Sequence, residues 1–256
     1  MKIIVLIKEV PDTWGDRRLD LKTGLLDRSS AEPVVDEINE RALEVALSYA
    51  TAQADSEIVA LAVGPATVPT SLRKALGMGA DSAVHVLDDG LVGADLTLTA
   101  QVIAAAVTRI GFDLVIAGNV STDGGASAVP SMVAELLGVP AATYLSTVEI
   151  TADSVAGRRE TEAGTFEVKA ALPAVVSITE ALPDARFPNF KGIMAAKKKP
   201  FETLTLADVA ITPTEEARSI VISVTQRPAR TAGTIITDEG DAGQQLADFL
   251  AKNKLI

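Results

Sequence analysis

The feature that most constrains the fold is an alternation of short apolar runs with longer amphipathic segments over residues 1–145. The apolar runs are rich in β-branched residues, which is typical of strands covered on both faces. We expect strands at residues 2–7, 57–63, 83–87, 113–118 and 174–179. Apolar side chains at helical spacing predict helices at residues 36–53, 67–78 and 94–110. This alternation indicates an α/β fold with a doubly wound, mostly parallel sheet.

Two segments depart from this alternation. Residues 18–29 have a Thr-Gly pair between two short runs and are interpreted as a hairpin. Residues 148–172 have turn signals at Ala156-Gly157 and Ala163-Gly164, so we expect antiparallel strands at the edge of the sheet. We therefore assign residues 1–182 to an α/β domain.

The chain changes character from about Pro183. Residues 183–256 contain scattered prolines, a lysine run, short apolar patches and a final amphipathic stretch. Such a segment buries little apolar area by itself, so we expect it to fold onto another surface. We divide it into a basic segment, 183–200, and an extended C-terminal arm, 201–256.

Composition excludes several classes of protein. The chain has no cysteine, which removes disulfides, thiolate zinc sites and cysteine nucleophiles. Its single histidine, His85, lies in an apolar run and is interpreted as a packed residue of a strand. A net charge of −11 opposes binding to nucleic acid or anionic lipid. The absence of a long apolar run predicts no membrane insertion and a cytoplasmic location.

The segment that follows the apolar run 113–118 is rich in small and polar residues. Gly118 allows a sharp departure from the strand, Gly124 and Gly125 allow close backbone approach, and Pro130 suits a helix start. A helix start presents unpaired N–H groups, which suit an anion. Asp123 is awkward beside a phosphate, although a carboxylate can hold a ribose hydroxyl or orient the loop. An ordinary surface turn is the alternative interpretation, because G-x-G-x-x-G and the P-loop signature are both missing.

Basic and aromatic residues gather between Asp184 and Lys199. A lysine run is most often a solvated face. Phe187 and Phe190 beside these charges favour a docking surface for an acidic partner, in which an apolar anchor supplies affinity. Nucleic acid is the competing partner, but the overall charge of the chain opposes it.

Several motifs occur in an order that matches a known family. They are KIIVLIKEVPD (2–12), VVDEINERALEVAL (34–47), AVGPATVPTSLRKALGMGADSAVHV (62–86), LPAVVSIT (172–179), ARFPNFKGIMAAKKKP (185–200) and QRPARTAG (226–233). Along nearly its full length the chain resembles the β subunit of electron transfer flavoproteins. The GIMAAKKK stretch after an Arg-aromatic-Pro loop is specific to that family.

The resemblance implies a subunit without catalytic residues, in a heterodimer with an electron transfer flavoprotein α subunit. It implies a Rossmann-like fold of the adenine-nucleotide-binding type, a structural AMP in this chain, and an FAD held mainly by the α subunit at the interface. Electrons would pass from acyl-CoA dehydrogenases of fatty acid β-oxidation to the FAD, and on to a membrane electron transfer flavoprotein-quinone oxidoreductase. Residues 201–256 would pack on the α subunit.

The resemblance also implies the residues that bind AMP. They are Leu6, Asp36, Glu37, Ile38, Asn39, Val63, Gly118, Asn119, Val120, Ser121, Thr122, Asp123, Gly124, Gly125, Ala126, Ser127, Ala128 and Val129. Many relatives end this loop with Gln-Thr-Gly or Gln-Val-Gly where this chain has Ala128-Val129-Pro130, so Ser127 or Ser131 is expected to replace one phosphate contact.

A second set of residues is implied for partner recognition, with Phe190 as the apolar anchor. They are Arg186, Phe187, Pro188, Asn189, Phe190, Lys191, Gly192, Ile193, Met194 and Ala195. Ala195 stands where some relatives have a lysine, which removes one steering charge.

Two alternatives stay open from the sequence. Bifurcating relatives hold a second FAD in place of AMP, and AMP is favoured here because the loop lacks the bifurcating pattern. An adenylating enzyme of a related fold is the other alternative, but its pyrophosphate loop would follow the first strand, where this chain has KEVPDTWGD (8–16).

Overall fold

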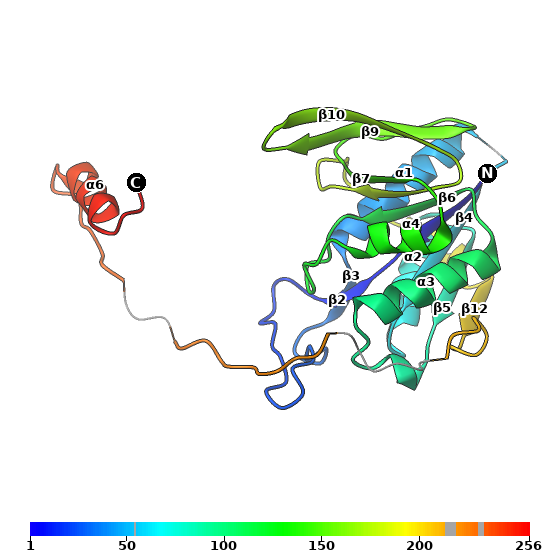
Figure 1. Cartoon of the computed structure of the whole chain (residues 1–256), viewed down its shortest axis with the longest axis horizontal. Coiled ribbons are helices and arrows are strands. Elements are labelled where there is room, and N and C mark those ends of the chain that lie inside the picture. The colour runs from blue at the N-terminus through cyan, green and yellow to red at the C-terminus, as the bar shows by residue number, and fades with distance from the viewer. Residues whose placement is uncertain (54, 213–218, 230–232) are drawn as a thin grey trace. The chain divides into compact units, whose positions relative to one another are not determined.

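A computed structural model describes residues 1–53, 55–212, 219–229 and 233–256 (Figure 1). The chain forms two units, Met1–Ser223 and Val224–Ile256. The end of the QRPARTAG motif, Arg230 to Ala232, lies outside the described residues, as do residues 213–218 of the predicted arm.

The body of the first unit is a sheet of ten strands (Figure 1). Its order is β10-β9-β7-β11-β6-β1-β4-β5-β12, with β8 paired to β9. The parallel strands are β1 (Lys2–Leu6), β4 (Glu57–Val63), β5 (Ser82–Val86), β6 (Leu114–Gly118), β7 (Ala141–Leu145), β11 (Ala174–Ile178) and β12 (Phe201–Leu204). The antiparallel edge consists of β8 (Glu149–Ile150), β9 (Ser154–Thr161) and β10 (Gly164–Ala171). The predicted α/β class, mostly parallel sheet and antiparallel edge are confirmed.

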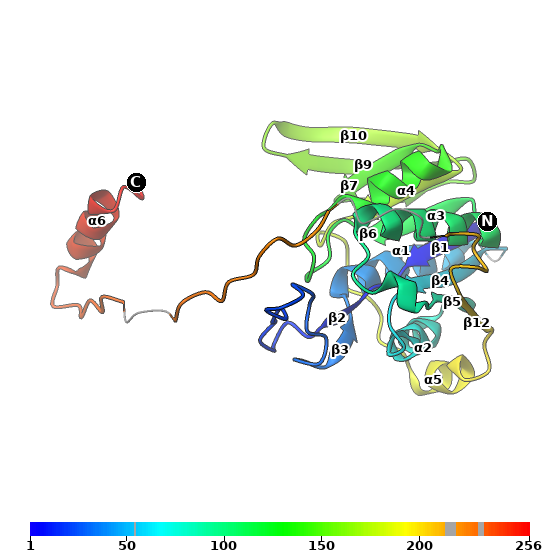
Figure 2. The same cartoon turned by 60° about the horizontal axis from the view of Figure 1, so that its bottom comes forward.

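Helices cover both faces of this sheet, as a doubly wound fold requires (Figures 1 and 2). One face packs against α1 (Glu37–Ala52) and α2 (Val68–Met78), and the other against α3 (Leu96–Ile110) and α4 (Val129–Leu137). Successive side chains of a strand point to opposite faces. In β1, Ile3 and Val5 therefore pack with the first pair of helices, and Ile4 packs with the second. Burial on both faces explains why these strands lack polar alternation.

Four short elements complete the described part of the first unit. β2 (Glu9–Pro11) and β3 (Pro33–Val35) form a separate antiparallel ribbon in the long connection after β1. A 3-10 turn, η1 (Asp89–Leu91), precedes α3, and α5 (Phe190–Ala196) packs against α2. The predicted hairpin at 18–29 is reduced to a single bridge between Leu19 and Leu26.

The order of the strands reverses at β1, and we call the edge at the carboxyl ends of β1, β4 and β6 the crevice. From β1 the chain moves outward to β4 and β5, and it then returns to place β6 on the other side of β1. The loops after β1 and β6 therefore diverge from neighbouring strands. In open α/β sheets, ligands bind where the strand order reverses in this way.

The structure corrects two details of the sequence prediction. Gly157 was predicted in a turn, but it lies inside β9, because the carbonyl of Thr147 passes so close that only glycine fits. Phe201–Leu204 was predicted in the arm, but it forms β12 and pairs with β5. The turn predicted at Ala163-Gly164 does separate β9 from β10.

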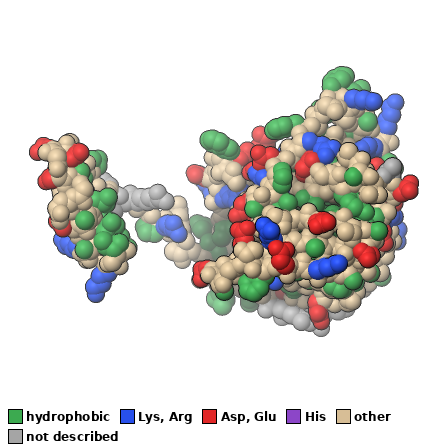
Figure 3. Space-filling view, turned by 90° about the horizontal axis from the view of Figure 1, so that it is seen from above, with side chains coloured by type: hydrophobic (Ala, Val, Ile, Leu, Met, Phe, Trp, Pro, Cys, Tyr) green, Lys and Arg blue, Asp and Glu red, His purple; other side chains and the backbone are tan. Residues whose placement is uncertain are grey.

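The second unit contains one helix, α6 (Ala242–Lys252), within its described residues. Its Leu246 and Phe249 are exposed, and Figure 3 shows apolar side chains gathered on this unit. None of the helix residues is buried. The amphipathic stretch therefore folds as a helix that has no core of its own. No helix among the described residues has the length and apolarity needed to cross a bilayer.

The close approach at Gly157 predicts a loss of stability in Gly157→Ala. A Cβ atom there would lie 1.9 Å from the carbonyl oxygen of Thr147, so the β8–β9 edge must shift. We expect the free energy of unfolding to fall by about 1–3 kcal/mol, measured by urea unfolding followed by circular dichroism. Gly243→Ala in α6 is the control, because no atom lies within 4 Å of its added Cβ. Equal unfolding midpoints for both variants would contradict the prediction.

Candidate functional site

The crevice brings together most of the residues predicted to bind a nucleotide. Leu6, Val63 and Gly118 end β1, β4 and β6, and Asp36 immediately precedes α1. The loop 119–128 follows β6 and leads into α4. Val63 lies one strand away from β1 and packs in the core beneath α3. The predicted set thus forms one site at the carboxyl edge of the sheet.

Asp36 joins the start of α1 to the loop after β6. Its Oδ2 atom accepts hydrogen bonds from Thr122 N at 2.8 Å and from Thr122 Oγ1 at 3.2 Å. Asp36 occupies the N-cap position of α1, but its side chain makes no capping bond to the helix. Burial raises the pKa of this carboxyl and outweighs the bonds from Thr122. The side chain therefore orients the loop instead of capping the helix.

Gly118 allows the start of α1 to lie directly against β6. A Cβ atom at this position would meet Ile38 Cγ2 at 2.4 Å and Asn39 Nδ2 at 2.9 Å. Asn39 Oδ1 in turn accepts a hydrogen bond from Lys8 N at 2.9 Å. The close contact explains why glycine ends the strand. Together with the bond from Lys8, it ties the loop after β1, the start of α1 and the end of β6 to one another.

Two buried acceptor oxygens in the crevice have no hydrogen-bond partner among the described residues. They are Asp36 Oδ1 and Asn119 Oδ1. A buried polar atom without a partner costs free energy comparable to its lost hydrogen bonds with water. The crevice is therefore suited to a ligand that donates hydrogen bonds.

Three cations that the sequence analysis did not select surround the loop. Lys8 Nζ lies 2.6 Å from Asp123 Oδ1 and 3.1 Å from Ser121 Oγ. Arg28 lies 3.9 Å from Asp123 Oδ2, and Arg17 donates to the carbonyl oxygen and the hydroxyl of Thr122. Their position in the sequence could have identified them. All three lie in the connection that follows the first strand, and that connection begins at the same edge of the sheet as the loop after β6.

Asp123 was expected to be awkward beside a phosphate because of its negative charge, and its contacts neutralise that charge. Its side chain is only 4% exposed, and it pairs with Lys8 and Arg28. Burial acts to raise the pKa of the carboxyl, but the hydrogen bond and charge of Lys8, with bonds from Ser121 and Gly124, outweigh burial and lower it. Asp123 is therefore a negative group neutralised inside the loop.

The end of the loop is exposed, although the amides of Gly124 and Gly125 donate hydrogen bonds within the loop, to Asp123 Oδ1 at 2.6 Å and to Ser121 O at 3.0 Å. Gly124, Gly125 and Ala126 are exposed, and Gly125 has a φ of +64°, a conformation that glycine adopts at little cost. α4 begins at Val129 with Pro130 in its first turn, and no described side chain caps it. Ser127 lies beside this start, with its carbonyl oxygen 3.4 Å from the Tyr144 hydroxyl. Unpaired N–H groups at a helix start carry partial positive charge.

The predicted docking segment, residues 186–195, exposes its two aromatic side chains. Phe187 is 89% exposed and Phe190 80% exposed. Asn189 caps α5 through a hydrogen bond from Gly192 N at 2.8 Å. The segment therefore presents two large apolar side chains next to an ordered helical turn.

The lysines of the run 197–199 differ in their surroundings. Lys197 and Lys198 are exposed. Lys199 turns inward, and its Nζ atom lies 2.5 Å from Ala80 O and 3.1 Å from Leu76 O at the end of α2. Burial lowers the pKa of Lys199. Cations at a helix C-terminus bind its unpaired carbonyls, so Lys199 stabilises α2 and does not belong to the docking surface.

The environment of Asp123 predicts how stability depends on pH. Because its pKa in the folded protein is lower than in the unfolded chain, about 3.9, its ionised form stabilises the fold. This contribution is fully present above the unfolded pKa and is lost as the pH falls through the lowered folded value. We expect Asp123→Asn to reduce the free energy of unfolding at pH 7 by roughly 1–3 kcal/mol.

Urea unfolding at a series of pH values tests this prediction. The difference between the wild type and Asp123→Asn should shrink as the pH falls below about 4. Asp16→Asn is the control, because the Asp16 side chain is 87% exposed. A difference that is constant with pH would contradict the assignment.

Comparison with known proteins identifies the family. The family model described as electron transfer flavoprotein domain matches residues 23–209. The electron transfer flavoprotein subunit beta of Mycobacterium tuberculosis is 47% identical over 99% of both chains, and that of Bacillus subtilis is 31% identical over 98% of this chain and 96% of its own. CarD of the caffeyl-CoA reductase-Etf complex of Acetobacterium woodii is 31% identical over 93% of this chain and 92% of its own. The resemblance is confirmed, and the chain belongs to the electron transfer flavoprotein β subunit family.

Proposed function

We propose that this chain binds one structural AMP in the crevice and holds the FAD of an α subunit at their interface. Electrons from acyl-CoA dehydrogenases would reach this FAD and pass to a membrane quinone oxidoreductase. The chain would be a cytoplasmic electron-carrier subunit of fatty acid oxidation and would contribute no catalytic residue. The observation that carries the proposal is the crevice, in which buried acceptors, cations and an uncapped helix start lie at one edge of the sheet.

The residues present fit a mononucleotide. Asp36 Oδ1 and Asn119 Oδ1 require donors, and ribose hydroxyls and the adenine amino group are donors. A phosphate accepts hydrogen bonds, so it suits the opposite end of the loop, where Ala126 is exposed and α4 begins without a side-chain cap. The bound AMP would bridge the strand ends and stabilise the crevice.

A second FAD in the same crevice is the alternative. The adenosine part of FAD offers the same donors as AMP, so the two buried oxygens do not distinguish them. The adenylating enzyme is disfavoured by an observation in the fold. The connection after β1 forms the β2–β3 ribbon, where such an enzyme would hold pyrophosphate.

Two further surfaces fit the proposed partners. Phe187 and Phe190 offer an apolar anchor to a dehydrogenase. The amphipathic helix α6, with exposed Leu246 and Phe249, suits a groove on the α subunit. Within its own unit each surface lacks a cover among the described residues, as expected for a subunit that functions in a complex.

Mass spectrometry of the small molecules released on denaturing the purified complex tests the nucleotide assignment. We expect one AMP and one FAD for each pair of subunits. Two FAD molecules without AMP would support the alternative. A folded complex that releases neither AMP nor a second FAD would contradict the proposal.

The docking assignment predicts that Phe190→Ala slows electron transfer from an acyl-CoA dehydrogenase. Loss of an interface hot spot costs about 2 kcal/mol or more. This corresponds to an increase of about 30-fold in the KM of the dehydrogenase for the α–β complex. AMP and flavin contents should be unchanged, because Phe190 lies outside the crevice. Leu136→Ala on α4 is the control, since Leu136 is a half-exposed apolar residue elsewhere on the surface. Loss of cofactor in Phe190→Ala would show that the segment has another role.

A further inference from the structure

Two side chains of α1 hold the segment that leads into the docking residues. Arg41 and Glu44 are three positions apart and therefore lie on the same side of the helix. Arg41 donates to the carbonyl oxygen of Leu182 and pairs with the carboxylate of Asp184. Glu44 accepts hydrogen bonds from Arg186. The start of the docking segment is thus attached to α1 through charged groups.

The bond between Glu44 and Arg186 has three parts. Glu44 Oε2 accepts from Arg186 N at 3.0 Å and from Nε at 2.7 Å, and Oε1 accepts from the guanidinium at 2.7 Å. Bidentate pairs of this kind fix orientation as well as distance. The Glu44 side chain is only 16% exposed. Burial acts to raise the pKa of its carboxyl, but the bonds from Arg186 outweigh burial and lower it.

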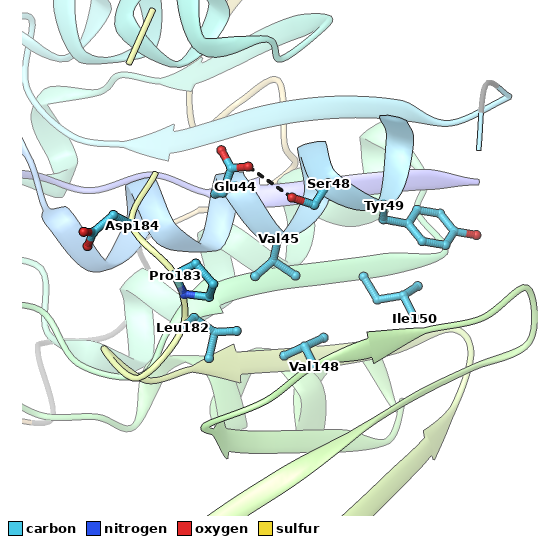
Figure 4. A pocket seen from close by; sticks show the side chains of 9 residues that line it. All are labelled: Glu44, Val45, Ser48, Tyr49, Val148, Ile150, Leu182, Pro183 and Asp184. Atoms are coloured by element: carbon cyan, nitrogen blue, oxygen red, sulfur yellow. Dashed lines mark hydrogen bonds between the residues drawn. The ribbon is translucent and has the colours of Figure 1, made fainter. Parts of the chain in front are cut away.

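Apolar packing holds only part of the chain at this point: Leu182 is buried in the core and Ala185 packs against it. A cavity of 330 Å³ separates the outer face of α1 from the chain at 182–184 and from β8 (Figure 4). Val45 of α1 and Val148 face this cavity together with Leu182. The cavity lies beside this packing, and the charged contacts of Arg41 and Glu44 add directional bonds to Asp184 and Arg186.

The other end of the segment is fixed on α2. A Cβ atom at Gly192 would lie 2.3 Å from Gly77 O, so α5 and α2 are in direct backbone contact. Arg73 donates to Ala196 O at 2.7 Å. The exposed residues Phe187 and Phe190 lie between these two attachments.

We infer that Glu44 is a positioning residue of the docking surface. By binding both the backbone and the guanidinium of Arg186, it holds the chain before Phe187 in one arrangement. The inference rests on the proposed docking of a dehydrogenase on this segment. Ordering the segment in advance lowers the entropy lost when a partner binds.

A double-mutant cycle in the complete α–β complex tests this inference. Glu44→Ala, Arg186→Ala and the double variant should each raise the KM for the complex by about 3- to 10-fold with an acyl-CoA dehydrogenase as donor. The three increases should be equal, because each variant breaks the same bond. kcat and flavin content should not change. Increases that multiply in the double variant would overturn the inference, because Arg186 would then contact the partner itself. An unchanged KM in Glu44→Ala would also overturn it.

Ser48→Ala is the matched control on the same helix. Ser48 Oγ donates to Glu44 Oε1 at 3.0 Å and has no contact with Arg186, so this variant should keep the wild-type KM. A change as large as that of Glu44→Ala would show that any disturbance of α1 has the same effect.

Hydrogen exchange of the segment gives a measurement that needs no dehydrogenase. In Glu44→Ala, peptides covering residues 183–192 should exchange their amide hydrogens faster than in the wild type, while Ser48→Ala should not differ. Equal exchange in Glu44→Ala and the wild type would overturn the positioning role, whether or not the complex accepts electrons. A wild-type complex that accepts no electrons while Glu44→Ala shows faster exchange would count against the proposed docking alone.

Discussion

The site depends on the contact between the start of α1 and the end of β6. Gly118 leaves no Cβ, so Ile38 and Asn39 lie directly against the strand. That approach brings Asp36 within hydrogen-bond distance of Thr122, which ties the helix to the loop. In any fold with crossover connections, the carboxyl ends of the parallel strands lie at the same edge of the sheet. This contact makes that edge into a crevice with buried acceptors.

Sequence periodicity was sufficient for five of the seven parallel strands, and it missed β7 and β12. The strands at β1, β4, β5, β6 and β11 were predicted within a residue or two, because burial on both faces selects continuous β-branched runs. Gly157 was misassigned, because glycine serves a turn and a close approach equally well and only the path of Thr147 distinguishes them. β12 was missed because its strand character comes from pairing with β5, 115 or more residues earlier in the chain.

The candidate site shows the same division. The loop residues 118–129 were predicted from small side chains and from resemblance, and the structure places them at the crevice. Lys8, Arg17 and Arg28 were not, since their contacts with residues 121–123 join segments about a hundred residues apart. The role of Asp123 also depends on those contacts, because an unpaired carboxylate would repel a phosphate whereas a paired one does not.

Most of the charged side chains discussed for the crevice and for the basic segment pair with other groups of this chain. Lys8 and Arg28 neutralise Asp123, Lys199 binds the end of α2, and Arg186 is held by Glu44. In a chain with a net charge of −11, few cations of the basic segment are then left to steer a partner, chiefly Lys191, Lys197 and Lys198. If a partner docks here as proposed, its affinity would come largely from Phe187 and Phe190, and their contribution would depend on how firmly the surrounding chain is held.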